Sequence, residues 1–411
     1  MSRIQIKNFG PIKSGATTTD GWIDFTKVTA FCGPQGSGKS TIVKIYSFFS
    51  WLEKVLTRGD YRESAWNNTK KFPKEFTDFH NVEEYFRPDT VLRYQGWSYS
   101  FTWGNGRFDL AKVQKPAAEY LMPKIMYVPA ERNFMSVIEA VDKVKNIPQS
   151  LKAMTKEFLE ACKNYSEGIE FPLEGFSFAY DKLNRIGKVR FKDGGEVRLS
   201  AASSGIQSMT PLFLVSEYLF NQLNEDRDAS KGMSLREYRK VLDDVFEQLS
   251  VEELPDAIRQ ALSQYNAALN KRFINIVEEP EQNLFPTSQE KLLFKLIEYA
   301  KGNDRFQDNQ LVLTTHSPYI IDYLRLVTLA AENLDRFRQH GDQLHTVLTE
   351  GSLINKDDVS LYETKSNGTI VRLTNDEGYV NDDNPLNNEL KDIKEDTATA
   401  EEWKEGQYRD D

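Results

Sequence analysis

Cysteine is scarce in this chain, with only Cys32 and Cys162 among 411 residues. Two thiols cannot form the disulfide framework of a small secreted domain or a zinc site with four thiolates. The sequence also lacks a run of about 18 apolar residues, which a membrane-spanning helix needs. Its first ten residues, MSRIQIKNFG, lack the apolar core of a signal peptide. We therefore expect a cytoplasmic protein that contacts no membrane.

Glycine and proline are too few, at 23 and 15 residues, for a collagen-like or low-complexity chain. Hydrophobic residues make up 39% of the sequence and charged residues 28%, as in ordinary globular proteins. No internal repeat is present, and no heptad pattern persists over the roughly 50 residues that a long coiled-coil arm requires. The length suffices for a large core, in two or three domains or in one domain with insertions.

Basic residues are outnumbered, and the chain carries a net charge of −10. The excess lies at the end, where residues 376–411 hold thirteen acidic and four basic residues. The preceding 375 residues hold 49 acidic and 48 basic residues and are nearly neutral. Such a body can still carry a local basic patch, so the net charge does not exclude DNA. We expect residues 376–411 to form an acidic tail with little order beyond about residue 380.

Apolar patterns predict an α/β fold. Ile4 and Ile6 alternate with polar residues, as in a strand. A strand predicted at 28–32 leads into a glycine-rich loop and then a helix from Ser40 to about Leu56, which is how α/β domains begin. Further strands are predicted at 22–25, 125–128, 273–277 and 311–314, hairpins at 90–103, 188–199 and 360–374, and helices within 135–168 and 205–272.

The glycine-rich loop is the strongest chemical signal. It matches G-x-x-x-x-G-K-S completely, through Gly33, Pro34, Gln35, Gly36, Ser37, Gly38, Lys39 and Ser40, and continues with Thr41. Glycines allow backbone N–H groups to turn inward around phosphates, and the following helix directs its positive end at the same anion. The pattern predicts that Lys39 reaches the β- and γ-phosphates of a ligand and that the Ser40 hydroxyl binds Mg²⁺. The complete match argues against a plain glycine turn before a helix.

Two later strands end in side chains suited to phosphate hydrolysis. The strand predicted at 273–277 delivers Glu278 and Glu279 to the end where open α/β sheets bind ligands. One carboxylate can hold Mg²⁺ through water, and the other can accept a proton from the attacking water. The strand predicted at 311–314 leads to His316, whose imidazole can contact a γ-phosphate.

A segment of small residues precedes a mostly apolar helix. Ser203, Ser204 and Gly205 stand before the apolar stretch 209–220. A helix N-terminus of this composition can bind an anion, and an ordinary helix cap is the alternative. The position of this segment among the other motifs favours the anion-binding interpretation.

The order of these four motifs resembles that of ABC-class ATPases. The resemblance implies ATP and Mg²⁺ as ligands, and two copies that close head to tail around ATP so that each signature segment completes its partner's site. The implied assignments are Walker A for Lys39 and Ser40, the signature segment for Ser203, Ser204 and Gly205, the Walker B metal residue for Glu278, the catalytic base for Glu279 and the switch histidine for His316.

The residues that make up the motifs narrow the resemblance to a smaller group of ATPases. The stretch EEPEQNLFP at 278–286 is similar to the E-E-P-E-x-x-L-[HF]-P stretch of OLD-family (overcoming lysogenization defect) and related SMC/RecF-like ATPases. The stretches YVPAER at 127–132 and THSP at 315–318 also resemble that group, and the likeness covers roughly residues 1–375. Three positions depart from the general ABC pattern. Glu278 replaces aspartate, Ser204 replaces the first signature glycine, and Glu131 or Arg132 takes the place of the Q-loop glutamine.

The chain ends differently from OLD proteins, which carry a TOPRIM nuclease domain. Only 95 residues follow His316, without the strand–Glu and Asp-x-Asp pattern of that domain. The resemblance is therefore to stand-alone ATPase subunits of two-gene anti-phage systems such as PARIS and Septu, in which a separate nuclease is the effector. It implies an ABC-type ATPase domain with a mixed sheet at 1–375, helical insertions at about 135–170 and 210–270, and the acidic tail at 376–411.

Two other functions are alternatives on the sequence. A RecF/SMC-like DNA-binding repair ATPase would use the basic residues of one predicted hairpin, although solvated edge strands also carry such residues. A nucleotide-binding subunit of a transporter is disfavoured by the atypical signature and the lack of any membrane segment. The basic residues of that hairpin are Lys182, Arg185, Lys188, Arg190, Lys192 and Arg198.

Overall fold

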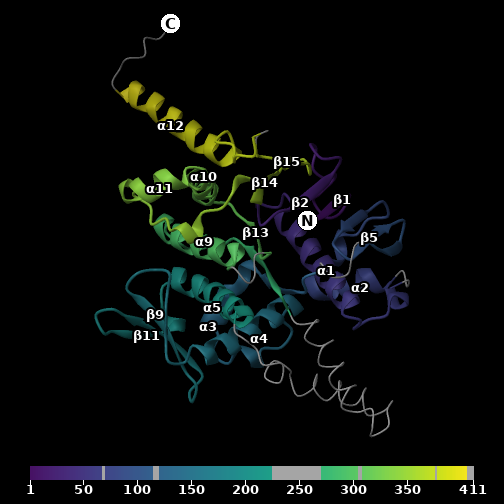
Figure 1. Ribbon diagram of the computed structural model, residues 1–411, viewed down its shortest axis with the longest axis horizontal. Helices are drawn as coiled ribbons and strands as arrows, with labels where there is room; N and C mark the ends of the chain where they lie inside the picture. Colours follow the sequence, from purple (N-terminus) through teal and green to yellow (C-terminus); the bar gives the residue numbers. More distant parts are fainter. Residues whose placement is uncertain (67–69, 114–119, 225–269, 304–307, 375–376, 405–411) are drawn as a thin grey trace.

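The structure is a computed structural model that describes residues 1–66, 70–113, 120–224, 270–303, 308–374 and 377–404. Within these residues the strands form three sheets, and helices cover both faces of the central one (Figure 1). This mixed α/β architecture confirms the predicted fold class. Cys32 and Cys162 are both buried, and neither is in a disulfide bond.

The central sheet has six strands in the order β15-β14-β3-β13-β12-β7. Neighbours are parallel throughout, except that β15 runs antiparallel to β14. Parallel strands place their carboxyl ends at one edge, so the segments that follow β3, β12 and β13 meet there. The strands are β3 (Val28–Cys32), β7 (Pro123–Val128), β12 (Arg272–Glu278), β13 (Gln310–Thr314), β14 (Val359–Thr364) and β15 (Ile370–Arg372).

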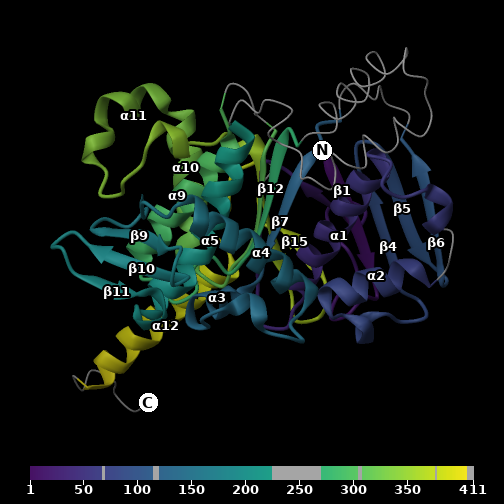
Figure 2. The same ribbon diagram turned by 90° about the horizontal axis from the view of Figure 1, so that it is seen from below.

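Alternate residues of the central strands enter two separate hydrophobic cores. Every residue of β3, β12 and β13 is buried, as expected for strands covered on both faces. Ile274 and Ile276 face α1 (Lys39–Thr57), whereas Leu311 and Leu313 face the opposite core. Figure 2 shows the sheet between these layers. The helices of the second layer are α5 (Ser204–Asn224), α9 (Pro286–Lys301) and α10 (Pro318–Glu332).

An antiparallel sheet in the order β2-β1-β4-β5-β6 packs beyond α1. Its core is aromatic, with Phe49 of α1 stacked on Phe72 of α2 (Lys71–His80), their ring centroids 5.5 Å apart. The predicted hairpin at 90–103 is confirmed. Helix α2 was not predicted, because its apolar positions Phe72 and Phe76 are separated by charged residues in a stretch with no clear period. The strands are β1 (Ser2–Lys7), β2 (Trp22–Phe25), β4 (Val91–Gln95), β5 (Tyr99–Gly104) and β6 (Arg107–Lys112).

A third sheet, in the order β11-β10-β9-β8, lies beside α3 (Phe134–Val137) and α4 (Gln149–Asn164). The helix predicted within 135–168 is therefore present as α4, after the short α3. The second predicted insertion, 210–270, falls mostly on residues 225–269, which lie outside the described residues. The strands are β8 (Ile169–Glu170), β9 (Phe176–Asp181), β10 (Ile186–Phe191) and β11 (Glu196–Arg198).

The C-terminal region contains α11 (Leu334–His340) and a helix of 20 residues, α12 (Pro385–Lys404). The expectation of little order beyond about residue 380 is therefore wrong for 385–404. Most positions of α12 are polar or charged, so its sequence gives little helical signal. A hydrogen bond from Asn387 to Asp322 fixes its first turn. Beyond this turn α12 projects from the body (Figure 1). Among the described residues, no helix is long and apolar enough to cross a membrane.

Candidate nucleotide-binding site

The phosphate loop joins the buried strand β3 to α1, and glycine sets its path. Gly33, Gly36 and Gly38 have φ values of 130°, 73° and 110°, which L side chains rarely adopt. A Cβ atom at Gly33 would lie 2.2 Å from the backbone oxygen of Thr364 at the end of β14. Residues 34–36 are exposed. The loop is therefore a backbone cradle open to solvent, which suits it to a phosphate group.

Lys39 is the first residue of α1 and turns back into the loop. Its Nζ donates hydrogen bonds to the backbone oxygens of Gly33 and Pro34, both at 2.8 Å. Burial lowers the pKa of Lys39, while the carboxylates of Glu279, Glu281 and Glu278 act in the opposite direction. The amine thus occupies the mouth of the cradle and can exchange these carbonyls for phosphate oxygens.

The hydroxyl residues around Lys39 have different environments. Ser37 donates a hydrogen bond to the Pro34 backbone oxygen at 2.7 Å and lies 2.5 Å from the Thr364 hydroxyl, so it stabilises the loop. Thr41 is buried, whereas Ser40 is partly exposed beside the cradle. Ser40 and the carboxylates after β12 supply hard oxygen donors of the kind that Mg²⁺ prefers. The residues present therefore fit both ATP and Mg²⁺.

Glu278 ends β12 with its carboxylate buried at 4% exposure. Its Oε1 accepts a hydrogen bond from the Tyr127 hydroxyl at 2.8 Å, and its Oε2 accepts one from the Ala130 backbone N–H at 3.3 Å. Tyr127 lies near the end of β7, the parallel neighbour of β12, and Ala130 lies just after it. Glu278 is thus held in one orientation before any ligand binds.

Glu279 has an unusual backbone conformation, with φ of 45°. A residue other than glycine pays on the order of 1–3 kcal/mol in such a sparsely populated region, so neighbouring groups must hold it there. Its N–H donates to the Thr314 backbone oxygen at 2.9 Å. Its carboxylate is partly exposed, and Oε1 lies 3.5 Å from His316 Nε2.

The electrostatics around Glu279 favour its ionised form. The hydrogen bond from His316 is the largest cause of a lowered pKa for Glu279, and the charges of His316, Lys39 and Arg132 add to it, against the opposing effect of burial. A carboxylate that stays ionised at neutral pH can accept a proton from water. Glu279 is therefore an ionised, partly exposed carboxylate beside His316 at the edge of the sheet.

Arg132, which with Glu131 is a candidate for the Q-loop position, lies just after β7. Its side chain has no exposed surface and donates to the backbone oxygens of Glu278 and Glu279, both at 2.6 Å, and of Ser208 at 3.0 Å. Burial lowers the pKa of Arg132 to about 10. Arg132 is therefore enclosed in the protein, whereas Glu131 is exposed.

Sequence reasoning missed the role of Glu281. This carboxylate is buried, and burial raises its pKa. Its Oε1 accepts the backbone N–H of His316 at 2.6 Å, so Glu281 ties the segment after β12 to the segment after β13. A third acidic residue in an E-E-P-E run was the available signal, but spacing alone does not show which acid faces inward.

The segment with Ser203, Ser204 and Gly205 lies at the start of α5. Both serines are exposed, and a Cβ atom at Gly205 would lie 2.8 Å from the backbone oxygen of Asn283. No hydrogen bond joins this segment to the phosphate loop among the described residues. The structure thus gathers Lys39, Glu278, Glu279 and His316 at one edge of the sheet but leaves the Ser203–Gly205 segment facing outward.

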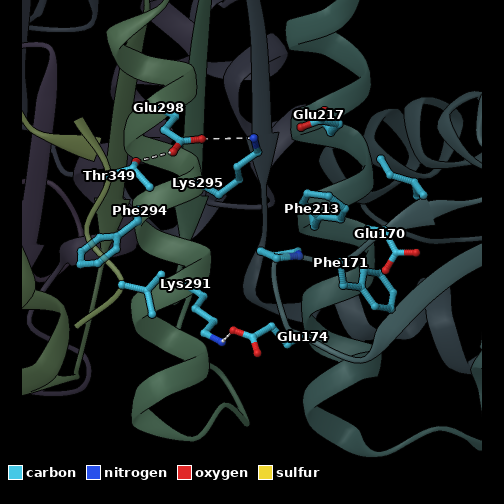
Figure 3. A pocket seen from close by; sticks show the side chains of 13 residues that line it. Glu170, Phe171, Glu174, Phe213, Glu217, Lys291, Phe294, Lys295, Glu298 and Thr349 are labelled. Atoms are coloured by element: carbon cyan, nitrogen blue, oxygen red, sulfur yellow. Dashed lines mark hydrogen bonds and ion pairs between the residues drawn. The ribbon is translucent and has the colours of Figure 1, made fainter. Parts of the chain in front are cut away.

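Cavities elsewhere in the molecule are separate from this edge. A pocket of about 420 Å³ between α5 and α9 contains ion pairs of Lys291 with Glu174 and of Lys295 with Glu298, at 2.8 and 3.1 Å (Figure 3). None of the predicted site residues lines it. A larger cavity, of about 920 Å³, lies between α1 and α4, and Tyr127 is among the residues that line it.

Comparisons with known proteins agree with an ATPase. The family described as AAA ATPase domain matches residues 256–321. The matched stretch includes β12, α9 and β13, and with them Glu278, Glu279 and His316, but not the phosphate loop. A search of curated proteins gave no match.

Among solved structures, the chain is similar to heads of SMC proteins. The SMC head domain from Thermotoga maritima is 12% identical, with 90% of this chain and 97% of that chain covered and a TM-score of 0.32. An Smc head bound to the C-terminal winged-helix domain of ScpA is 13% identical, with 90% and 96% covered and a TM-score of 0.35. A head from Pyrococcus furiosus bound to the C-terminal domain of ScpA is 12% identical, with 91% and 96% covered and a TM-score of 0.33. Identities and TM-scores this low indicate only a distant similarity to these heads.

Proposed function

We propose that this protein is an ABC-class ATPase of the OLD-like group, which dimerises around ATP and controls a separate effector in prokaryotic anti-phage defence. One observation carries the ATPase part of the proposal. The edge of a single parallel sheet presents an open phosphate cradle with Lys39 in it, a buried carboxylate at Glu278, and a Glu279–His316 pair.

The chain's own residues divide the work of hydrolysis. Lys39 moves from the loop carbonyls to phosphate oxygens and neutralises charge that develops on them. Glu279 orients the attacking water and accepts its proton, while His316 holds Glu279 and contacts the γ-phosphate. Ser40 and Glu278 would hold Mg²⁺, the latter through water, and the ion would supply further neutralisation of phosphate charge.

The signature segment supports a dimer. Ser203 and Ser204 are exposed and not bonded to their own phosphate loop, so they are free to meet a nucleotide held by a second copy. We propose that Ser203, Ser204 and Gly205 complete the partner's site in trans. Hydrolysis then releases the dimer, and the ATP-bound and released forms are the two states of a switch.

The effector would be a separate protein, such as a nuclease. Helix α12 offers a surface for it, because Leu390 and Ile393 are 42% and 54% exposed on the projecting part of the helix. Residues 385–404 carry six acidic and three basic residues, so the fitting partner is an apolar groove with a basic rim. Removal of residues 381–411 should abolish effector binding and leave ATP turnover unchanged. Unchanged binding would end this part of the proposal.

The alternative, a RecF/SMC-like DNA repair ATPase, rests on the basic hairpin at 182–198. Four of its six cations are already in ion pairs: Lys188 and Arg190 with Glu196, Arg185 with Asp142, and Arg198 with Glu139. Paired cations contribute less to phosphate binding, which favours a solvated surface over a DNA site.

The test is ATP turnover by the purified chain, with and without linear duplex DNA, with Glu279→Gln as the blank. A rate that depends on Glu279 and is indifferent to DNA supports a partner-gated switch. Strong stimulation by DNA, with a steep salt dependence of binding, favours the DNA-binding alternative. No turnover above the blank contradicts the ATPase proposal.

A further inference from the structure

The strained backbone of Glu279 is held by residues that cannot touch a nucleotide. Its carbonyl oxygen accepts a hydrogen bond from Arg132 at 2.6 Å, and the carbonyl of Glu278 accepts a second one from the same guanidinium. A φ of 45° is unfavourable for a residue other than glycine, so contacts with neighbouring groups must stabilise it. Because the backbone direction at Glu279 sets where its carboxylate points, Arg132 fixes the aim of the proposed base.

The same guanidinium also binds the helix that carries the signature segment. Arg132 Nε donates to the backbone oxygen of Ser208, in the second turn of α5 and four residues after Ser204. A second link runs parallel to it, because Asn283 Nδ2 donates to the Ser208 hydroxyl at 2.9 Å. Ser136, just beyond Arg132, bonds the Gln207 backbone oxygen at 2.7 Å. The start of α5 and the loop after β12 are thus joined in two ways, through the buried cation of Arg132 and directly through Asn283 and Ser208.

We propose that Arg132 is a positioning residue that couples the start of α5 to the Glu278–Glu279 loop. When the signature segment of one protomer engages its partner's nucleotide, the shift of α5 passes through Arg132 to that protomer's own Glu279. Hydrolysis is therefore regulated by engagement of the signature segment. This inference rests on the proposed dimeric ATPase.

Arginine suits this task better than lysine. Its planar guanidinium reaches four carbonyl oxygens at once from fixed directions, those of Pro129, Ser208, Glu278 and Glu279, whereas an ammonium group is a compact charge on a flexible chain. Arg132→Lys keeps the buried charge and loses that geometry. Arg272→Lys is the matched control, because Arg272 is also buried and starts the same strand, β12, at the end away from the site.

The first measurement separates positioning from folding. We expect Arg132→Lys to lower kcat for ATP by about 10-fold to 100-fold, since small misplacements of catalytic groups cost this much. The affinity for a non-hydrolysable ATP analogue should stay within about two-fold of wild type, because Arg132 touches no part of the cradle. Arg272→Lys should leave kcat near the wild-type value. An unchanged kcat in Arg132→Lys, or equal losses of kcat and affinity in it, would overturn the inference.

The second measurement follows the coupling itself by hydrogen exchange of backbone amides in the full chain. In a Glu279→Gln background with ATP and Mg²⁺, dimer closure should protect residues 204–210 and 278–284 together. With Arg132→Lys added, 204–210 should stay protected while 278–284 should not. Equal protection of both segments in the double variant would contradict the coupling.

The two proposals fail in different ways. If the wild-type chain neither hydrolyses ATP nor dimerises, the proposed function fails. Exchange without nucleotide still tests Arg132 in that case, because Arg132→Lys should speed exchange of 278–284 and Arg272→Lys should not. If hydrolysis and dimerisation are present and Arg132→Lys behaves as wild type, only the role of Arg132 fails.

Discussion

The phosphate loop and the loop after β12 lie at the same edge of the sheet but are built by different means. In the phosphate loop, three glycines within six residues adopt positive φ values, and Lys39 bonds the loop's own carbonyls. In the loop after β12, Glu279 and Asn283 adopt positive φ values without glycine. Arg132 and Thr314 hold the backbone of Glu279, and Ser208 accepts a hydrogen bond from the side chain of Asn283; all three come from distant parts of the chain.

The difference separates a conformation encoded locally from one imposed by tertiary contacts. The phosphate loop depends on its own residues, so changes within it should act on nucleotide binding. The loop after β12 depends on remote groups, so changes at residues that touch no nucleotide should act on catalysis. The expected effects below run from the largest to the smallest.

Lys39→Ala should have the largest effect, because it removes the cation that meets developing phosphate charge. We expect ATP turnover to fall by at least about 100-fold, with weaker binding of a fluorescent ATP analogue. Lys44→Ala removes the same charge five residues later in α1 and is the control. Equal losses in the two variants would show that net charge, rather than the position of Lys39, explains the effect.

Gly33→Ala tests both the backbone conformation of the phosphate loop and its fit against the end of β14. The added Cβ would lie 2.2 Å from the Thr364 backbone oxygen at a φ of 130°, so the loop must shift. We expect ATP affinity to fall by roughly 10-fold or more. Gly59→Ala has a positive φ of 80° in open space just after α1 and should leave ATP affinity unchanged. Binding measured by titration with the fluorescent analogue decides between a specific effect and general strain.

Tyr127→Phe tests the remote support of Glu278. Loss of the hydroxyl leaves Oε1 without its donor, at a cost of about 1–3 kcal/mol. We expect the Mg²⁺ concentration for half-maximal turnover to rise several-fold. Tyr94→Phe removes a similar buried hydroxyl, bonded to Glu53 at 2.6 Å away from the site, and should lower stability without changing the Mg²⁺ requirement. The same Mg²⁺ dependence in both variants would contradict the role of Tyr127.

His316→Gln should produce the smallest loss of rate, because the amide can still reach a phosphate oxygen, and the most specific change, in the pH dependence of kcat. His316 is the main cause of the lowered pKa of Glu279, so the wild-type rate should fall only below the ordinary glutamate value of about 4.3. Loss of His316 should move this acid limb to higher pH, because protonation of Glu279 then occurs more readily. The exposed His340 provides a control in His340→Gln. An acid limb that does not move would mean that Glu279 is not the titrating base.

The sequence predicted the elements that have a local signal. Continuous apolar runs predicted β3, β12 and β13, and glycine spacing predicted the phosphate loop. The asparagine–glycine turn at 367–368 predicted the last hairpin. The helix α12 was missed because disorder was inferred from composition, and α2 was missed because its apolar positions are few.

The candidate site was predictable as a set of side chains but not as a connected structure. Glu278, Glu279 and His316 follow apolar strands, so their convergence could be expected from a parallel sheet. The contacts of Tyr127, Arg132 and Ser208 with Glu278 and the loop after β12 join residues 75 to 151 positions apart. A single sequence carries no signal for such pairs, because only tertiary packing brings them together.

The central claim is that Glu279 is the base of an ATP site which closes as a dimer. The most direct measurement is the oligomeric state of Glu279→Gln with ATP and Mg²⁺, by light scattering after size exclusion, with turnover measured on the same sample. We expect Glu279→Gln to form a stable dimer that retains unhydrolysed ATP, whereas the wild type returns to its starting state as ATP is consumed. A variant that hydrolyses ATP at the wild-type rate, or binds ATP and stays monomeric, would contradict the central claim.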